Sequence, residues 1–211
     1  MDEQLKTGTT TVGIACKDGI VLAADKRATA GSLIVDKRAE KVHVLNEDFA
    51  VTIAGSVSDA QLIIKLMRAE LKLKEVRTNK HTSAKEAANL LGGILYGNLR
   101  RMSMYPGIAH FLMGGKDREG VHLYDLFPDG SVTKVRDFVS SGSGSVFAYG
   151  VLEAQYKPDI TTADGVKLAV KAVNTALQRD TFSGNGLDVI VVTDKDIKRV
   201  IQKELEINLE K

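Results

Sequence analysis

The run of residues with the clearest chemical potential is Thr7-Gly8-Thr9-Thr10-Thr11 near the start of the chain. A threonine hydroxyl is a poor nucleophile and needs a base to take its proton. If the bond between Gly8 and Thr9 is cut, Thr9 gains a free α-amine, whose reference pKa of about 7.7–8.0 suits a base near neutral pH. Gly8 lets the backbone bend so that the Thr9 hydroxyl can reach the carbonyl before it. The same residues are also compatible with an ordinary β-branched first strand.

Two charged residues strengthen the interpretation of Thr9 as a nucleophile. Asp25 ends the strand that is expected to pair with the strand of Thr9, and Lys41 lies on the next strand, on the opposite face from Val42. A buried Asp–Lys pair beside Thr9 is expected to keep Lys41 charged and to lower the pKa of the Thr9 hydroxyl and amine. Either charge alone is typical of a protein surface. Residues 1–8 are therefore expected to be a leader, and 9–211 a single catalytic domain.

Other reactive side chains give weaker signals. Cys16 is the only cysteine, which excludes an internal disulfide framework and a multi-cysteine zinc site, and its apolar strand favours a core position. The glycine-rich run at 142–145 is not followed by the Lys-Ser/Thr of a phosphate loop, so by itself it favours a strand-to-helix turn. No metal site or cofactor is expected, because the histidines lack metal-ligand spacing. They are His43, His81, His110 and His122.

Composition and charge limit the class of protein. The chain has 211 residues, 44% of them hydrophobic and 27% charged, which is typical of a globular domain. The formal charge of +2 gives no reason to expect a nucleic-acid or membrane surface. A basic run within 65–80 is interrupted by Glu70 and Glu75 and has no interleaved aromatics, so it favours a solvated helix face. No stretch approaches the about 20 apolar residues of a membrane span, and the first eight residues do not resemble a secretory signal, so a cytoplasmic protein is expected.

Hairpin signals and helical periodicity alternate along the chain. Strands are expected at 9–16, 20–25, 40–45, 49–54, 110–114, 121–127, 131–139 and 187–193, and helices at 59–77, 83–102, 146–155 and 162–179. The section 198–209 is compatible with a strand or a helix. The buried stripe of the first helix is expected to hold Leu62, Ile63, Leu66, Ala69, Leu73 and Val76. Together the elements predict an α+β fold of two stacked antiparallel sheets with helices outside.

Five segments, in order, resemble a proteasome beta-type subunit of the archaeal kind with a short leader. They are 8–13 (GTTTVG), 22–27 (LAADKR), 53–55 (IAG), 142–145 (GSGS) and 179–184 (RDTFSG). Each motif alone is weak, but five in register are highly specific, and the likeness runs from Gly8 to about Thr193. The resemblance implies the four-layer αββα sandwich of the N-terminal nucleophile hydrolases.

The same resemblance implies roles for individual residues. Thr9 would be exposed by autolysis after Gly8 and attack the peptide carbonyl, with Asp25 and Lys41 tuning it. Three residues would orient the Thr9 amine by hydrogen bonds. These are Ser143, Asp180 and Ser183.

The resemblance also implies how substrate is held. The backbone N–H of Gly55 would face the oxyanion. Thr29 and Gly55 would align the substrate backbone by strand-like pairing. The positions that line the pocket are small or aliphatic and uncharged, so cleavage after hydrophobic residues is expected. They are Ala28, Ala39, Ile53 and Val57.

Assembly and partners are implied in the same way. The chain would be a threonine-type endopeptidase subunit of the 20S proteasome core, in a ring of beta subunits stacked against alpha-type subunits. Unfolded proteins would be the substrates, and a regulatory ATPase an indirect partner. Two alternatives are a non-catalytic scaffold subunit of the same architecture and a bacterial-type two-ring protease driven by an ATPase. Ser143 and the segment 180–183 favour the archaeal kind over the bacterial one.

Overall fold

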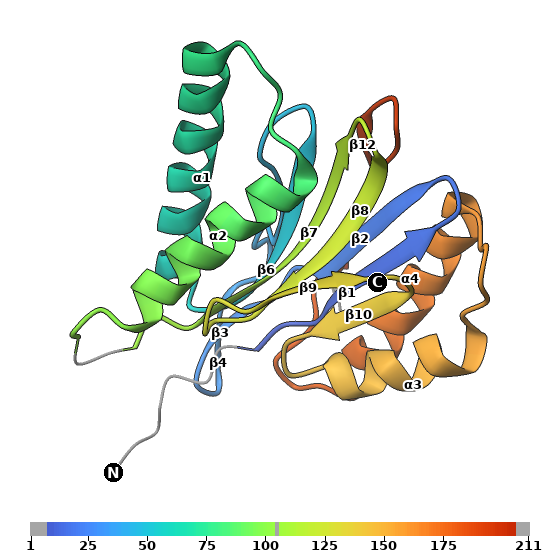
Figure 1. The fold of residues 1–211 in the computed structure, drawn as a ribbon. Coiled ribbons are helices and arrows are strands. Elements are labelled where there is room, and N and C mark those ends of the chain that lie inside the picture. The colour runs from blue at the N-terminus through green and yellow to red at the C-terminus, as the bar shows by residue number, and fades with distance from the viewer. Residues whose placement is uncertain (1–7, 104–105, 206–211) are drawn as a thin grey trace.

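The computed structural model describes residues 8–103 and 106–205, and within them the fold is α+β with four helices and antiparallel sheets (Figure 1). The first sheet has the order β10-β1-β2-β11-β12 and is formed by β1 (Thr11–Cys16), β2 (Gly19–Asp25), β10 (Phe138–Ser141), β11 (Gly186–Val192) and β12 (Ile197–Glu204). The second has the order β5-β6-β7-β8-β9 and is formed by β5 (Val42–Val44), β6 (Phe49–Gly55), β7 (Ala109–Asp117), β8 (Gly120–Leu126) and β9 (Val132–Val135). A separate hairpin pairs β3 (Ala28–Ala30) with β4 (Leu33–Asp36).

Each sheet carries a pair of helices on one face (Figure 1). The helices α1 (Val57–Thr78) and α2 (Ala84–Leu99) pack against the second sheet, and α3 (Ser145–Gln155) and α4 (Thr162–Leu177) pack against the first. A capping box stabilises the start of α2, because the side chains of Ser83 and Glu86 each bond the other residue's backbone N–H. None of the helices in the described ranges combines the length and the apolar character needed to span a bilayer.

The hydrophobic core of the described residues divides into three clusters. One lies between α1, α2 and the second sheet, and another between α3, α4 and the first sheet. The third joins the two sheets, through Leu22 of β2, Leu112 of β7 and Ile190 of β11. Because strand side chains alternate, Val21 and Ala23 of β2 face the helices while Leu22 faces the other sheet. This double burial explains the nearly unbroken apolar sequence of the central strands.

Two strand predictions are corrected by the structure. The expected strand at 131–139 is two strands in different sheets: β9 pairs with β8, and β10 pairs with β1. The chain bends at Arg136-Asp137 and crosses over, but the side-chain alternation continues on both sides of the bend, so the pattern did not reveal it. The β3–β4 hairpin was not predicted, because each strand is only three or four residues long. The open choice for the tail is settled as far as Leu205 by β12; residues 206–209 of that section lie outside the described residues.

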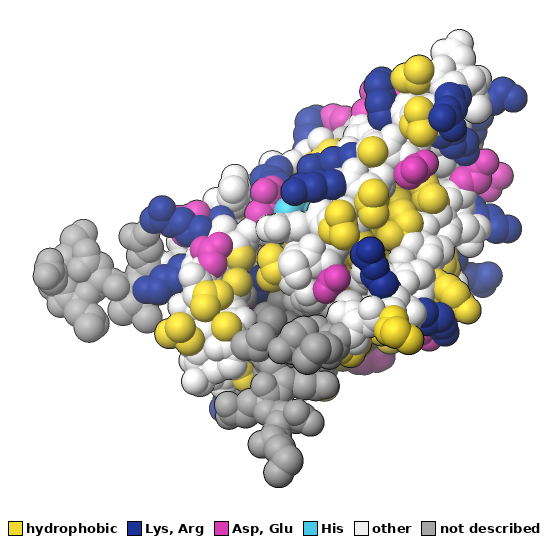
Figure 2. All heavy atoms as spheres, turned by 90° about the vertical axis from the view of Figure 1, so that its left-hand side faces the viewer, with side chains coloured by type: hydrophobic (Ala, Val, Ile, Leu, Met, Phe, Trp, Pro, Cys, Tyr) yellow, Lys and Arg dark blue, Asp and Glu magenta, His cyan; other side chains and the backbone are white. Residues whose placement is uncertain are grey.

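The buried stripe predicted for α1 is only partly right. The side that packs on the sheet holds Ala60, Ile63, Ile64, Met67 and Leu71, so of the predicted stripe only Ile63 is among the buried residues. Leu62, Leu66, Leu73 and Val76 are exposed, Val76 at 69%. Figure 2, which faces α1 and α2, shows hydrophobic side chains interspersed with Lys and Arg. The helix therefore carries apolar residues on more than one face, and periodicity alone did not select the face that meets the sheet.

Candidate active site

Thr9 lies just before β1, buried at the edge of the first sheet. Its hydroxyl donates a hydrogen bond to the Gly8 carbonyl oxygen at 2.6 Å. Its backbone N–H donates to Ser143 Oγ at 3.2 Å, and its carbonyl accepts from the Gly144 N–H at 3.2 Å. The hydroxyl is thus held against the carbonyl of the bond that joins Gly8 to Thr9.

Asp25, the last residue of β2, is completely buried and surrounded by donors. Its Oδ1 accepts from Lys41 Nζ at 2.8 Å and from the Thr10 N–H at 3.0 Å. Its Oδ2 accepts from the N–H groups of Arg27 at 3.0 Å and Gly184 at 2.9 Å. One carboxylate therefore ties together the start of β1, the end of β2 and the segment before β11.

Lys41 completes the predicted pair and points at the same carbonyl as the Thr9 hydroxyl. Its side chain is buried, and Nζ lies 2.8 Å from Asp25 Oδ1 and 3.5 Å from the Gly8 carbonyl oxygen. Asp25 acts on Lys41 in the expected direction, because its charge and its hydrogen bond both raise the pKa of the lysine. Burial lowers the pKa of Lys41 below its ordinary value, and the attraction of Asp25 and Asp180 offsets this only in part. Because its pKa is lowered, the Lys41 ammonium gives up a proton more readily than that of a surface lysine.

A second group of predicted residues meets the backbone of Thr9 from the other side. Ser143 and Ser183 each donate to Asp180 Oδ2, both at 2.6 Å. Ser143 Oγ accepts from the Thr9 N–H, as described above, so the carboxylate fixes the direction of that hydroxyl. The predicted residues Thr9, Asp25, Lys41, Ser143, Asp180 and Ser183 are therefore brought together, although they come from distant parts of the sequence.

Thr10 belongs to this network but was given no role by the sequence analysis. Its hydroxyl lies 2.7 Å from Ser183 Oγ, and its N–H bonds Asp25. It therefore links the lysine–aspartate side of the site to the serine–aspartate side. Only its completely buried position beside Thr9 distinguishes it from other strand threonines, and burial of a single threonine is not readable from sequence.

The glycine-rich run forms the expected turn between β10 and α3, and it also wraps around Thr9. Gly142 has φ of +90°, and a Cβ there would clash with the Thr9 carbonyl. A Cβ on Gly144 would clash with the Thr10 hydroxyl. Glycine is needed at both positions because the Thr9 carbonyl and the Thr10 hydroxyl leave no room for a Cβ.

Gly55 ends β6 on the opposite side of the site. The Ile53 N–H donates to the Lys41 carbonyl at 2.9 Å. Because strand N–H groups alternate in direction, the Gly55 N–H faces the same edge, beyond the start of β5. It is therefore directed toward the region of Lys41 and Gly8.

We expect Gly55→Ala to destabilise the subunit by about 1–3 kcal/mol. Gly55 has φ of +98°, and a Cβ would also clash with the Ile108 carbonyl oxygen. Thermal or denaturant unfolding of the isolated chain measures the change. Gly93→Ala on α2 is the matched control, because Gly93 is exposed and an added Cβ there meets open space. An alanine at position 55 that is as stable as wild type would contradict this conformational requirement.

Of the residues predicted to hold substrate, the structure brings only some into contact with the site. Thr29 Oγ1 accepts from the Gly8 N–H at 3.3 Å, so Thr29 lies at the site. Ala28 lies on β3, and the Ala39 N–H bonds the Lys26 carbonyl. Ile53 packs into the core beneath α1 and α2, whereas Val57 is 45% exposed at the start of α1. The pocket formed by Ala28, Ala39, Ile53 and Val57 stays a prediction.

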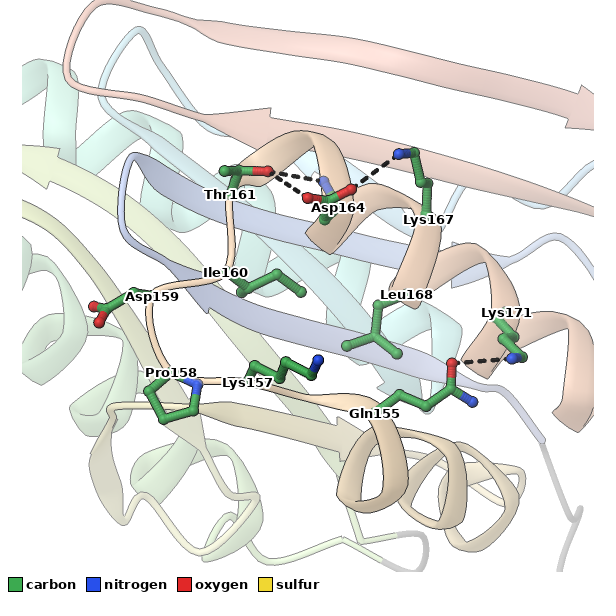
Figure 3. Close-up of a pocket in the computed structure, with 10 residues that line it drawn as sticks. All are labelled: Gln155, Lys157, Pro158, Asp159, Ile160, Thr161, Asp164, Lys167, Leu168 and Lys171. Carbon is green, nitrogen blue, oxygen red and sulfur yellow. Dashed lines mark hydrogen bonds and ion pairs between the residues drawn. The ribbon is translucent and has the colours of Figure 1, made fainter.

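Other reactive groups and hollows of the described residues lie elsewhere. A cavity of about 470 Å³ beside the start of α4 is lined by three lysines, but Lys167 pairs with Asp164 and Lys171 with Gln155 (Figure 3). Its lining residues on α4 run from Asp164 to Lys171, so it lies along the N-terminal part of the helix rather than at the end that leads to Asp180. Burial raises the pKa of the Cys16 thiol to about 12, so its nucleophilic thiolate is scarce at neutral pH.

Comparison with known proteins agrees with the predicted family. A model of the family described as proteasome subunit matches residues 5–192. The proteasome subunit beta of Methanocaldococcus fervens is 44% identical over 200 residues, covering 94% of this chain and 88% of the relative. That of Methanococcus maripaludis is 43% identical, covering 94% and 90%, and that of Ferroglobus placidus is 40% identical, covering 97% and 95%. With a family match over most of its length and relatives of 40–44% identity, the chain belongs to the proteasome subunit family, as its sequence motifs predicted.

Proposed function

We propose that the chain is a threonine-type endopeptidase subunit of the 20S proteasome core, activated by autolysis between Gly8 and Thr9. One observation carries the proposal: the Thr9 hydroxyl lies 2.6 Å from the Gly8 carbonyl oxygen, with Lys41 Nζ 3.5 Å from that same oxygen. A hydroxyl and an amine converge on the bond that has to be cut. The names of the relatives, all proteasome subunit beta, support the same function.

Activation follows from this geometry. Thr9 Oγ attacks the Gly8 carbonyl carbon, a C–O bond forms, and the C–N bond between Gly8 and Thr9 breaks. The hydroxyl proton ends on the Thr9 nitrogen, which leaves as an amine. In the intact chain that nitrogen is an amide and cannot act as the base, so Lys41 relays the proton. Water then hydrolyses the ester, which releases the leader as a carboxylic acid and restores the Thr9 hydroxyl.

Turnover of a substrate repeats the attack with a better base. The freed α-amine of Thr9 is held by Ser143, whose hydroxyl is fixed by Asp180. It takes the hydroxyl proton as Oγ attacks the substrate carbonyl, and gives the proton to the leaving amine as the acyl ester forms. The Gly55 N–H stabilises the oxyanion, and removal of such a donor costs about 2.7–4 kcal/mol in another hydrolase. Water hydrolyses the ester, with the α-amine again as base.

Specificity, architecture and assembly are proposed with this function. Ala28, Ala39, Ile53 and Val57 give an uncharged pocket, so cleavage after hydrophobic residues is preferred. The two sheets and two helix pairs form the αββα sandwich of N-terminal nucleophile hydrolases, which the three core clusters support. Beta subunits of this kind form a ring that stacks on alpha-type subunits in a cytoplasmic particle, fed with unfolded proteins by a regulatory ATPase.

The mass of the N-terminus tests the proposal. When the chain is coexpressed with an alpha-type partner, we expect the assembled particle to contain a mature form that begins at Thr9. The same particle is expected to hydrolyse fluorogenic peptides with a hydrophobic P1 residue faster than those with a charged one. Intact-protein mass spectrometry and initial rates measure both. Assembled particles that keep Met1 or Asp2 at the terminus and are inactive would support the scaffold alternative instead.

A further inference from the structure

A serine, a histidine and an aspartate outside the proposed machinery form a continuous hydrogen-bonded chain. His110 Nε2 lies 2.5 Å from Asp125 Oδ1, and His110 Nδ1 lies 2.6 Å from Ser141 Oγ. Asp125 and Ser141 are buried, and the His110 ring also lies against Phe127, with 4.4 Å between ring centroids. We call these three residues the His110 clamp.

The His110 clamp crosses from one sheet to the other. His110 is on β7 and Asp125 on β8, both in the second sheet, whereas Ser141 ends β10 in the first. Each lies two residues from a member of the cluster between the sheets, namely Leu112, Leu123 and Val139. Strand alternation therefore places all three side chains in the space between the sheets. Elsewhere this space is filled mainly by apolar side chains, so the clamp is a specific polar link across it.

Two members of the clamp, Ser141 and His110, adjoin the proposed site. Ser141 is followed directly by Gly142 and Ser143, and Ser143 holds the Thr9 nitrogen. On the other side, His110 pairs with Ala54 and its neighbour Ala109 pairs with Gly55. Ser141 is therefore two residues from Ser143, which orients the nucleophile, and the strand partner of His110 is next to Gly55, the proposed oxyanion donor.

We propose that His110, Asp125 and Ser141 are positioning residues, which set the distance between the Ser143–Thr9 side of the site and Gly55. The inference rests on the proposed function, because it assigns no reaction of its own. With His110 neutral, Nε2–H donates to Asp125 and Nδ1 accepts the Ser141 hydroxyl, so every group is satisfied. Rigid hydrogen bonds of this kind hold a site in its productive geometry.

Ser141, His110 and Asp125 have the residue types of a serine nucleophile, its base and an orienting acid. The burial of Ser141 nevertheless favours a positioning role over a role as a second nucleophile. Ser141 is only 4% exposed, and its hydroxyl is already engaged by His110. A nucleophile needs room for a substrate carbonyl beside its oxygen. The experiment below separates the two roles.

We expect Ser141→Ala and Asp125→Ala to lower kcat for a hydrophobic peptide about tenfold in assembled particles, with KM changed less than about twofold. Ser141→Thr keeps the hydroxyl and Asp125→Asn keeps an acceptor for Nε2–H, so both are expected to restore kcat to near the wild-type value. Ser141→Ala removes only one oxygen atom. If Asp125→Ala prevents assembly, the kcat of Ser141→Ala particles is the measurement that tests the positioning role.

The matched control is His122→Leu. His122 Nε2 lies 3.0 Å from Asp117 Oδ1, also on β8 and β7 but at the far end of these strands. It is expected to affect stability without changing kcat. Ser141→Ala particles with wild-type kcat would overturn this inference alone, whereas inactive wild-type particles would overturn the proposed function. Residual hydrolysis in Thr9→Ala particles that Ser141→Ala removes would overturn the positioning role, because Ser141 would then be a nucleophile.

Discussion

Thr9→Ala is expected to abolish peptide hydrolysis by the assembled particle and to leave the leader attached. Among residues 8–103 and 106–205, Thr9 Oγ1 is the one hydroxyl oxygen shown bonded to the Gly8 carbonyl, and the change removes it. Without it no ester forms, either with Gly8 or with substrate. We expect the rate to fall about 10⁴-fold or more, because loss of a nucleophile removes the covalent route entirely. Initial rates and intact-protein mass measure the two effects on the same sample.

Thr9→Ser and Thr10→Ala serve as controls for this variant. Serine keeps the hydroxyl, so Thr9→Ser is expected to process the leader and to retain activity. Thr10→Ala keeps Thr9 but removes the hydroxyl that bonds Ser183, so it is expected to lower activity far less. Assembled Thr9→Ala particles that hydrolyse hydrophobic peptides at the wild-type rate would refute the mechanism.

The part of the site that could be predicted from residues alone is the part built by neighbouring strands. The Asp18-Gly19 turn predicts that β1 and β2 form a hairpin, which places Asp25 beside the start of β1. Alternation then places Lys41 on the face opposite Val42. Here local pattern and tertiary structure agree, because short turns leave few ways to pair the strands.

The rest of the site depends on contacts that no local pattern encodes. Ser143 is 134 positions from Thr9 and 37 from Asp180, and only the family resemblance associated these residues. The crossover between β9 and β10, which brings Ser141 beside Thr11 and Ser143 to Thr9, was predicted as one continuous strand. Thr10 and the His110 clamp were missed for the same reason. Their residues have ordinary strand spacing, and only the packing of two sheets brings them together.

The pKa of Lys41 shows a further limit of prediction from sequence, because it depends on the energy of a contact rather than on which residues make it. The Asp25–Lys41 pair was predicted from the sequence, together with a charged Lys41, but the size of the opposing effect of burial was not. Attraction by a carboxylate raises the pKa of a lysine, whereas burial lowers it, and the outcome depends on how completely the pair is enclosed. Here burial is the larger effect, so the pKa of Lys41 lies below its ordinary value and its ammonium gives up a proton more readily than that of a surface lysine.

This balance makes Lys41→Ala the second large expected effect. We expect a loss of about 10²–10³-fold in hydrolysis and little or no leader removal, because the base and the charge nearest the Gly8 carbonyl are both lost. Assembly is expected to suffer much less. Asp25 keeps three backbone N–H donors, from Thr10, Arg27 and Gly184, so its buried carboxylate still has hydrogen-bond partners. Rates per assembled particle separate the two effects.

Lys26→Ala is the matched control, because Lys26 is also buried and paired, with Nζ 3.0 Å from Glu204 Oε1. Its ion pair faces β12 rather than Gly8, so it is expected to affect stability without changing kcat. Lys41→Arg separates proton relay from charge, because a guanidinium keeps its charge but does not release a proton in proteins. If Lys41 relays the proton, arginine is expected to be nearly as inactive as alanine. Substantial activity in Lys41→Arg would show that charge alone suffices, and equal losses of assembly and hydrolysis in Lys41→Ala would assign Lys41 a structural role.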